Sequence, residues 1–415
     1  MATTSTKTLK MAMVGIGVGG AEILPAMEST PGIELFAGAD INPTTRERFK
    51  ARYPNARVYD SIESLCADPD VDAVWVSTPN RFHGPHAIYA ANHAKHVVSE
   101  KPLALSLKEA EQMVEAARKN NVKLMAGHTM AYSLPIRSMR RIITSGKLGQ
   151  LRALHVWAYT DWMLRPRSGE ELDPEQGGGV PYRQHPHQVD TVRVLGGGKI
   201  RSVRGTTGHW HPERPIPGYY TAYLEFEDGT PCTILHNGYG YFMGEELVSW
   251  GTGQQRYSVE ERVAIRRAMV QGQRDEEGDK QDLRIGGQAE QRIFRERTGP
   301  RPWTPGDLGL VVASLDRGDI RHSKFGLYVY DDTGLHDIDL QAESGVGGRR
   351  AELVEFYDAV VLGKPLFHDG VWGMATLEVG LAIMESAKTR KEIMLTHQVP
   401  VPPEYDADLK VPYLQ

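Results

Sequence analysis

The chain has few cysteines, little net charge and no long apolar run. Among its 415 residues only Cys66 and Cys232 are cysteines, so a disulfide framework is excluded and we expect a reducing, cytoplasmic environment. No apolar run approaches the roughly 20 residues that cross a bilayer. The polar, threonine-rich stretch 1–10 also lacks the apolar core of a signal peptide. We therefore expect no membrane partner.

Positive and negative charges are also nearly balanced. The sequence has 48 Lys and Arg against 53 Asp and Glu, a net charge of −5. Such a mild balance gives no reason to expect nucleic acid or an acidic membrane surface as a partner. The length allows two domains and a large core.

Short apolar runs alternate with amphipathic stretches over residues 1–128. The helix expected at 106–120 has Ser106 as its N-cap and Glu109 at the capping-box position. Strands are expected at 10–14, 33–39, 71–77, 95–99 and 122–127, with a first helix at 19–29. Strands that alternate with helices predict an α/β domain with a parallel, doubly wound sheet, the Rossmann arrangement.

Residues 129–415 have a different pattern, in which strands follow one another more closely. A helix is expected at 136–145, and strands at 151–159, 200–207, 221–226, 230–237, 325–330 and 336–340. Glu227-Asp228-Gly229 and Asp331-Asp332-Thr333-Gly334 indicate hairpin turns. The pattern predicts a second α/β domain with a large, mostly antiparallel open sheet.

Three further helices are expected in this second domain. Those at 188–195 and 348–362 are predicted to pack on the antiparallel sheet, and a third lies at 374–388. An antiparallel sheet with an exposed face often pairs with a second subunit, so we expect a homodimer or homotetramer.

Residues 243–322 are charged and dotted with glycine, and we expect them to interrupt that sheet as an insertion. A capped helix should begin at Ser258, and a second helical piece should lie near 288–297. Two interpretations stay open. The insertion is either a solvated surface segment, or an oligomerisation arm or substrate lid.

A glycine-rich turn follows the first expected strand and opens the first helix. Four of its residues are predicted to contact a dinucleotide: Gly15, Gly17, Val18 and Gly20. Glycines at this spacing let the backbone approach a pyrophosphate at a helix N-terminus. Because 43 glycines make chance matches possible, a tight turn without a ligand is the alternative.

Asp40 lies at the end of the second expected strand, twenty residues after Gly20. A carboxylate at this place would accept a hydrogen bond from the ribose 2′-hydroxyl and repel a 2′-phosphate, so NAD is the predicted cofactor. Arg46 and Arg48 follow closely and leave NADP possible.

Two polar segments follow the third and fourth expected strands. The first contains Thr78, Pro79, Asn80 and His83, and could line the nicotinamide ribose or be an ordinary strand-to-helix loop. The second is Glu100-Lys101-Pro102. Ligands bind at the carboxyl ends of strands in open parallel sheets, so Lys101 is expected beside the reacting carbon.

Taken together, these segments resemble the Gfo/Idh/MocA family of glucose–fructose oxidoreductases and inositol dehydrogenases. The matching elements are the glycine turn, Thr78-Pro79-Asn80 with His83, Glu100-Lys101-Pro102, Gly177-Gly178-Gly179 followed by His187 and Asp190, and the closing stretches 351–366 and 377–387. The similarity covers about residues 9–242 and 323–395. The resemblance implies an NAD(P)-dependent dehydrogenase or reductase that acts on alcohols, with Lys101 and His187 as the catalytic pair.

The resemblance also implies roles for these residues. His187 would take the hydroxyl proton, because imidazole titrates near neutral pH. Lys101 would hydrogen-bond the same oxygen and stabilise the developing negative charge, with Glu100 holding the lysine. Tyr182, His185 and Asp190 are further candidates for the substrate site.

One departure from the family pattern bears on the substrate. The family commonly has an aspartate in the frame that reads Arg183-Gln184-His185-Pro186-His187 here. An arginine favours an anionic substrate, since guanidinium binds carboxylate in a bidentate manner. Arg165 and Arg167 could add to such a site; the alternative for each arginine is a structural salt bridge.

Several segments between residues 159 and 230 resemble the branch of the family that includes phthalate 4,5-cis-dihydrodiol dehydrogenase. That branch implies a cyclic cis-diol bearing carboxylates as the small-molecule substrate. A sugar or glycoside 3-dehydrogenase and a non-catalytic dinucleotide-binding sensor are the alternatives. His185-x-His187 and His209-x-His211 are spaced like metal ligands, but no cysteine or spaced carboxylate completes a signature, so we predict no metal.

Overall fold

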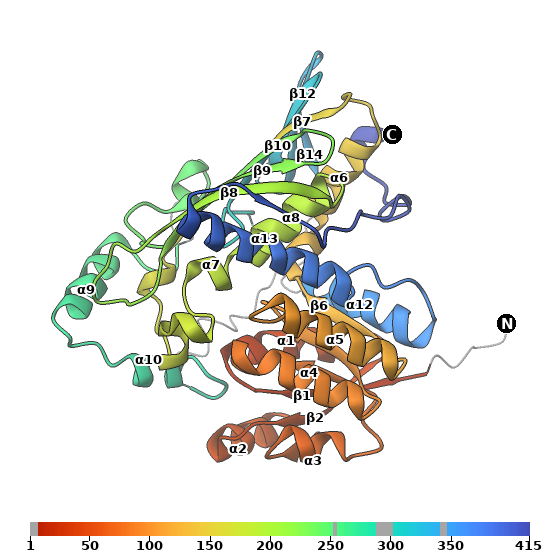
Figure 1. Ribbon diagram of the computed structural model, residues 1–415, viewed down its shortest axis with the longest axis vertical. Helices are drawn as coiled ribbons and strands as arrows, with labels where there is room; N and C mark the ends of the chain where they lie inside the picture. The colour runs from red at the N-terminus through yellow and green to blue at the C-terminus, as the bar shows by residue number, and fades with distance from the viewer. Residues whose placement is uncertain (1–6, 252–254, 288–301, 341–346) are drawn as a thin grey trace. The chain divides into compact units, whose positions relative to one another are not determined.

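The chain forms two compact units in the computed structural model, which describes residues 7–251, 255–287, 302–340 and 347–415 (Figure 1). Unit 1 comprises Met1–His128, Gly278–Arg297 and Val346–Met374. Unit 2 comprises Thr129–Glu277, Thr298–Gly345 and Ala375–Gln415. The chain therefore returns twice to unit 1 after residue 128.

Unit 1 is built on a six-stranded sheet in the order β3-β2-β1-β4-β5-β6, with every pair parallel. Its elements are β1 (Leu9–Val14), α1 (Val18–Ser29), β2 (Ile33–Ala39), α2 (Pro43–Arg52), β3 (Arg57–Tyr59), α3 (Ile62–Cys66), β4 (Ala73–Val76), α4 (His83–Asn92), β5 (His96–Glu100), α5 (Leu107–Lys119) and β6 (Leu124–Gly127). This confirms the predicted Rossmann sheet. The strand order reverses between β1 and β4, where such sheets bind ligands.

The strands of unit 1 are apolar because both faces of the sheet are covered. Every residue of β4 is buried, and α4 packs on β4 and β5 while α5 packs on β6 (Figure 1). Ser106 caps α5 as predicted, accepting from the Glu109 backbone N–H at 3.2 Å. The Glu109 carboxylate instead accepts from the N–H of Leu105 at 3.0 Å, one residue before the cap.

Helix α12 (Gly347–Val361) corrects one prediction, because it packs on α1 in unit 1 and not on the second sheet. The Tyr357 ring lies against Gly32, where a β-carbon would fall 2.6 Å from the ring. The Tyr357 hydroxyl donates to the carbonyl oxygen of Lys7 at 3.0 Å. The helical period identified the helix, but it carries no information on which surface the apolar side covers.

Unit 2 is built on a nine-stranded sheet in the order β14-β13-β12-β11-β7-β10-β9-β8-β15. Its elements are α6 (Leu134–Thr144), β7 (Leu151–Tyr159), α7 (Val180–Arg183), α8 (His185–Leu195), β8 (Ile200–Gly208), β9 (Tyr219–Phe226), β10 (Pro231–Asn237), α9 (Val259–Val270), α10 (Glu276–Asp282, which ends in unit 1), β11 (Leu310–Leu315), β12 (Gly318–His322), β13 (Gly326–Asp331), β14 (Gly334–Asp339), α13 (Gly370–Thr389, which starts in unit 1) and β15 (Ile393–Met394). Among the strands that the structure describes in this sheet, only β7 and β10 pair in parallel, so the mostly antiparallel sheet is confirmed.

The stretch 243–322 was wrongly predicted to interrupt this sheet throughout. Its last part forms β11 and β12, and β11 pairs directly with β7 near the middle of the sheet. The short, mostly apolar run Leu310–Leu315, bounded by Gly309 and Asp316, is the sequence signal that could have identified β11. Helix α9 begins after Ser258 with the predicted capping box, while the helical piece expected at 288–297 lies outside the described residues.

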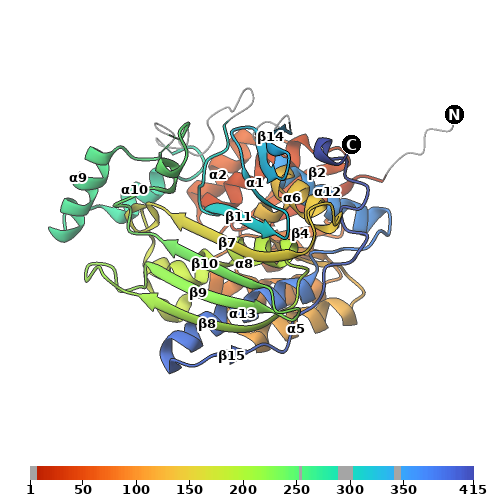
Figure 2. The same cartoon turned by 90° about the horizontal axis from the view of Figure 1, so that it is seen from above.

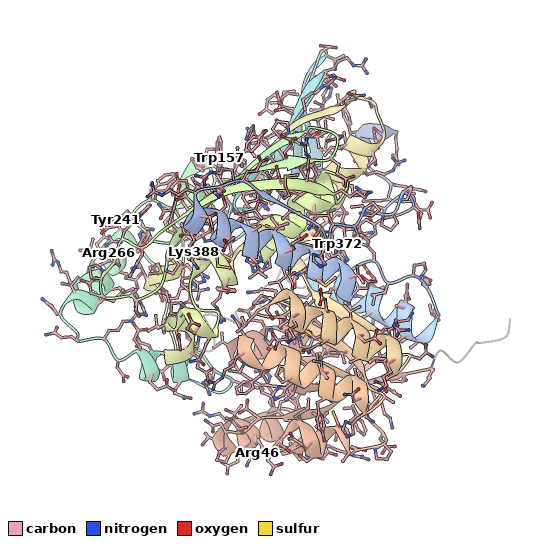
Figure 3. All side chains as sticks on the ribbon, in the orientation of Figure 1. Arg46, Trp157, Tyr241, Arg266, Trp372 and Lys388 are labelled. Atoms are coloured by element: carbon pink, nitrogen blue, oxygen red, sulfur yellow. The ribbon has the colours of Figure 1, made fainter. Side chains whose placement is uncertain are left out.

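The nine-stranded sheet has one covered face and one outer face. Figure 2 shows α8 and α13 behind the strands, and apolar residues of α6, α8 and α13 join the strands in one core. On the outer face Trp157 (Figure 3) and Tyr223 stay 43% and 44% exposed, between buried neighbours along β7 and β9. Within the described residues, no helix has the length and apolar character needed to cross a membrane.

Candidate active site

Three of the four glycines in the turn after β1 have different surroundings. A β-carbon on Gly15, which has φ +86°, would fall 2.7 Å from the carbonyl oxygen of Ser77. A β-carbon on Gly20 would fall 2.4 Å from the carbonyl oxygen of Gly15, whereas one on Gly17 would meet nothing within 4 Å. Gly15 and Gly20 thus allow the tight turn, and Gly17 leaves space in front of the α1 N-terminus. This arrangement fits a bound pyrophosphate.

Asp40 is fixed beside this turn by two backbone donors. Its carboxylate accepts from the N–H groups of Ile16 and Asn42, each at 2.8 Å. The Arg46 guanidinium donates to the carbonyl oxygens of Asp40 and Ile41 at 2.8 and 3.0 Å. Arg46 therefore lies at the ribose end of the predicted cofactor site.

Arg48, the other arginine considered for cofactor preference, is used differently. Its guanidinium donates to the carbonyl oxygen of Ile285 at 3.3 Å, and Gly286 lies against its side chain. Arg48 thus holds the segment that returns to unit 1 after residue 277.

The segments after β4 and β5 are joined by a buried histidine. The His83 ring nitrogens lie 2.8 Å from the carbonyl oxygen of Thr78 and 2.7 Å from that of Pro102. Pro79 precedes a short 3₁₀ turn, Asn80–Phe82, and Asn80 is buried. The described contacts of His83 are to backbone, although the sequence predicted a cofactor contact.

Arg349 of α12 was not identified from the sequence. Its guanidinium donates to the Glu22 carboxylate at 2.8 Å and lies 3.8 Å from a Glu100 carboxylate oxygen. Burial alone would lower the pKa of Arg349, but the carboxylates of Glu22, Glu100 and Glu352 raise it. Arg349 therefore connects α1 to Glu100, the residue before Lys101. Glu100 and Arg349 lie about 250 residues apart, so no local sequence pattern predicts their contact.

In unit 2, His187 lies in the first turn of α8 and is buried. The next residue, Gln188, fixes this turn to the sheet. Its amide donates to the carbonyl oxygens of Leu235 and Leu308 at 2.9 and 3.1 Å, and it accepts from the Tyr220 hydroxyl at 2.7 Å. His187 is thus presented from a rigid turn.

Asp190 lies one turn further along α8 and is 1% exposed. Its charge acts on Arg193, which binds Thr376 and the C-terminal segment at Val399. Burial lowers the pKa of Arg193, and the carboxylate of Asp190 partly offsets this shift.

Arg165, predicted to bind substrate, is occupied by two carboxylates. It donates to Asp161 at 2.8 Å and to both oxygens of Asp307 at 2.9 and 2.6 Å. Burial alone would raise the pKa of the Asp307 carboxyl, but Arg165 holds it far below its usual range, with smaller contributions from His236 and His187. We therefore leave Arg165 out of the proposed substrate site.

Asp307 is a residue that the sequence did not reveal. It is a half-buried carboxylate whose pKa His187 helps to lower, in a chain that has Arg183 where the family commonly has an acid. No motif surrounds it in Thr304-Pro305-Gly306-Asp307, so only the tertiary structure identifies it.

Arg183 belongs to a second cluster, with one carboxylate between two guanidinium groups. Glu171 lies 3.2 Å from Arg183 and 3.1 Å from Arg167. Arg167 is 8% exposed and stacks over the Trp162 ring at 3.6 Å, while Arg183 stays 24% exposed. Arg183 is the more accessible of the two arginines.

The neighbours of Arg183 differ in exposure. His185 is buried, with Nδ1 2.5 Å from the carbonyl oxygen of Pro181 and its ring packed against Gly380 of α13. We therefore treat His185 as a packing residue, contrary to its predicted place in the substrate site. Tyr182 is partly exposed, and burial raises the pKa of its hydroxyl.

The two His-x-His pairs make other contacts. His209 lies within hydrogen-bond distance of the carbonyl oxygens of His211 and Arg214, and His211 stacks on Tyr239. The ring centres of His211 and Tyr241 lie 6.2 Å apart, and the guanidinium of Arg266 lies 4.2 Å from the centre of the Tyr241 ring. Figure 3 labels Tyr241 and Arg266. In the part of the chain that the structure describes, no three His, Cys, Asp or Glu side chains are grouped to hold a metal ion.

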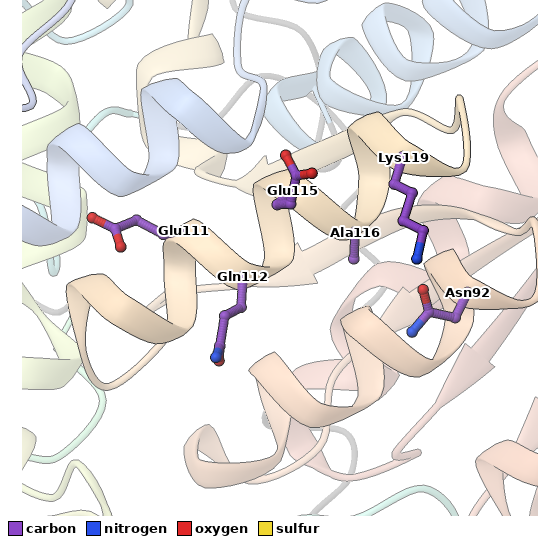
Figure 4. A pocket seen from close by; sticks show the side chains of 6 residues that line it. All are labelled: Asn92, Glu111, Gln112, Glu115, Ala116 and Lys119. Carbon is purple, nitrogen blue, oxygen red and sulfur yellow. The ribbon is translucent and has the colours of Figure 1, made fainter.

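A groove of about 380 Å³ between α4 and α5 is a separate surface feature (Figure 4). It is lined by Asn92, Glu111, Gln112, Glu115, Ala116 and Lys119. Asn92 and Lys119 end helices that lead into β5 and β6, so this end of the groove lies towards the amino ends of the strands. Ligands of such sheets bind at the opposite edge.

Comparison with known proteins agrees with this fold and this nucleotide site. Residues 9–128 match the model of the oxidoreductase family with an NAD-binding Rossmann fold, and residues 136–252 match the GFO/IDH/MocA C-terminal domain. The chain belongs to the Gfo/Idh/MocA family. It is an NAD-dependent dehydrogenase.

Individual relatives differ in their named substrates. The chain is 30% identical over 390 residues, 92% of its length and 95% of the relative, to a 1-carboxy-3-chloro-3,4-dihydroxycyclohexa-1,5-diene dehydrogenase of Comamonas testosteroni. It is 40% identical over 136 residues, 32% of its length and 40% of the relative, to a 1,5-anhydro-D-fructose reductase of Ensifer adhaerens.

Solved structures show the same fold. A putative dehydrogenase from Bordetella bronchiseptica RB50 matches with a TM-score of 0.83 and 31% identity, over 94% of this chain and all of that one. An oxidoreductase from Agrobacterium radiobacter, solved with NAD⁺, L-tartaric acid and magnesium, matches with a TM-score of 0.67 and 17% identity, over 94% and 98%.

Proposed function

We propose that the protein oxidises a carboxylated cyclic cis-dihydrodiol, such as phthalate 4,5-cis-dihydrodiol, in the catabolism of aromatic acids. The observation that carries this proposal is the guanidinium of Arg183, which lies four residues before His187 in the chain, is 24% exposed and lies 3.2 Å from Glu171. A guanidinium in this position suits a substrate carboxylate. The Comamonas relative, named for a carboxylated dihydroxycyclohexadiene, supports the same substrate class.

Within each unit, the structure supports a distinct task for the proposed catalytic residues. NAD supplies the hydride acceptor. Lys101 follows β5 at the carboxyl edge of the sheet, where its ammonium group would bind and polarise the substrate oxygen. His187, held by the Gln188 contacts, would take the hydroxyl proton at its imidazole.

A sugar or glycoside dehydrogenase is the second candidate. The reductase from Ensifer adhaerens, named for an anhydro sugar, favours it. In that case Arg183 would serve only as an ion-pair partner of Glu171.

The test is a substrate panel followed by NADH absorbance, with the unaltered chain and an Arg183→Met variant. With dihydrodiol acids, we expect turnover by the unaltered chain. In the variant we expect KM to rise about 10- to 100-fold, because one charge-assisted hydrogen bond to the substrate is lost. Arg317→Met, at an exposed turn, is the control and should leave KM unchanged.

Activity on neutral glycosides with none on dihydrodiol acids would contradict the substrate assignment. Lys101→Met tests the reaction itself. It should abolish turnover while NADH binding, measured by fluorescence, remains within a few-fold of the unaltered chain.

We also propose a cytoplasmic homo-oligomer. Both cysteines are free and buried, which suits a reducing compartment. The outer face of the nine-stranded sheet presents Trp157 and Tyr223, aromatic residues of the kind enriched at subunit interfaces.

A further inference from the structure

His83 holds two backbone segments of unit 1 at once. It begins α4 and is 2% exposed. Its Nε2 lies 2.8 Å from the Thr78 carbonyl oxygen, in the segment after β4. Its Nδ1 lies 2.7 Å from the Pro102 carbonyl oxygen, in the segment after β5 that carries Lys101.

The chemistry of the two partners fixes the number of protons on the ring. A carbonyl oxygen accepts hydrogen bonds and cannot donate one, and a neutral imidazole has a single N–H. With a neutral ring, one nitrogen lone pair would face a carbonyl oxygen at 2.7 or 2.8 Å. Only the doubly protonated ring donates to both oxygens.

A buried cation needs negative groups around it to offset its desolvation. The two carbonyl dipoles point at the ring, and the Glu109 carboxylate lies beside the next residue. A β-carbon on Gly84 would fall 2.4 Å from Glu109 Oε1. His86, one turn further along α4, has a pKa that burial lowers and that the Glu63 carboxylate partly restores.

We propose that His83 is doubly protonated in the folded protein and acts as a positioning residue, binding Thr78 and Pro102 together so that Lys101 is held against the segment after β4. The role in turnover rests on the proposed function of Lys101. The charge state does not, because it follows from the two carbonyl contacts alone.

This role differs from a direct contact with NAD. Both ring nitrogens are directed at backbone oxygens of the protein, so the ring sets the spacing of two segments at the carboxyl edge of β4 and β5. Misplacing a catalytic group by about 1 Å can cost on the order of 10²-fold in rate. Loss of His83 should therefore affect turnover far more than cofactor affinity.

The first experiment measures the protons directly. Neutron diffraction from crystals of the unaltered chain at pH 8, about 1.5 units above the usual imidazole pKa, should show deuterium on both ring nitrogens of His83. A single deuterium would overturn the proposal. This measurement needs no variant and no substrate, so it stands whether or not the proposed function is correct.

The second experiment measures the positioning role with His83→Gln, whose single amide nitrogen can reach one carbonyl oxygen but not two on opposite sides. We expect kcat with the best panel substrate to fall by about 10²-fold and the Kd for NADH to change less than threefold. The control is His93→Gln at the exposed end of α4, which should keep both values.

Two outcomes of the second experiment would overturn the positioning role. Unchanged kcat in His83→Gln is the first. A large rise in the Kd for NADH is the second, since it would make His83 a cofactor ligand.

Discussion

At the scale of single residues, the glycines of the turn after β1 have different requirements. Gly15 and Gly20 are needed because backbone oxygens occupy the places that their β-carbons would take. Gly17 has open space around it and φ −78°, a conformation that alanine also adopts. The folded protein therefore needs Gly20, whereas we propose that Gly17 is needed only for the approach of the pyrophosphate.

Alanine substitutions separate these two requirements. Gly20→Ala should lower the free energy of unfolding by about 2 kcal/mol or more, because its methyl group would overlap a backbone oxygen. Gly17→Ala should leave the free energy of unfolding unchanged within about 0.5 kcal/mol. The same variant should raise the Kd for NADH at least about 10-fold, because its methyl group would enter the space expected for the pyrophosphate. Urea unfolding and fluorescence titration measure the two effects. Equal NADH affinity in Gly17→Ala would place the pyrophosphate elsewhere.

The arginines show what a sequence position does not reveal about charge. Arg165 and Arg183 were both predicted to contact the substrate. Arg165 is held by two carboxylates, whereas Arg183 shares one carboxylate with Arg167. The number of partners depends on Asp307 and Glu171, which the chain brings to these arginines only on folding.

At the scale of elements, the C-terminal segment is attached to α13 by one carboxylate. Glu378 accepts from the backbone N–H groups of Thr396 and His397 and from the Gln398 amide, at 2.7 to 3.1 Å. Burial alone would raise the pKa of Glu378, but these hydrogen bonds and His397 lower it. The ionised form therefore stabilises the fold.

This attachment predicts a pH-dependent contribution to stability. A carboxyl with a lowered folded pKa stabilises above its unfolded value of about 4.3, and the contribution is lost as pH falls below that value. Glu378→Gln should cost about 1–3 kcal/mol in the free energy of unfolding at pH 7, and the difference should shrink between about pH 4.5 and pH 3.

Glu385→Gln on the exposed side of α13 is the matched control and should show no such difference. Denaturant unfolding across this pH range tests the prediction. If the free energy of unfolding differs between Glu378→Gln and the unaltered chain by the same amount at all pH values, the charge of Glu378 does not contribute to stability.

Most elements could be predicted from local patterns, and the exceptions have a common cause. The five main strands of unit 1 have the expected apolar runs, and α9 has the expected cap. Strand β11 was missed because it lies within a polar region and gains its partner β7 from about 150 residues earlier in the chain. Pairing over that separation is decided by the completed sheet.

At the scale of the whole molecule, the outer face of the nine-stranded sheet is the surface that we propose for self-association. On β7 and β9 the exposed Trp157 and Tyr223 alternate with buried residues. Trp157→Glu should reduce the oligomer mass measured by light scattering, because a buried charge at the interface would be desolvated without a partner.

Val270→Glu, at the exposed end of α9 and away from the sheet, is the control and should keep the mass of the unaltered chain. An unchanged mass in Trp157→Glu would exclude this face as the interface. A monomeric unaltered chain would contradict the proposed oligomer itself.

The sequence by itself determined the class of fold and the class of cofactor. Glycine spacing, strand period and the Glu100-Lys101-Pro102 segment act over short stretches of chain, so they can be recognised without coordinates. Only the tertiary structure decided that α12 packs in unit 1, that Arg165 is neutralised by Asp307, and that His83 binds two carbonyl oxygens. Each depends on groups far apart in sequence, whose approach is set by packing and by the need to pair buried charge and hydrogen-bonding groups.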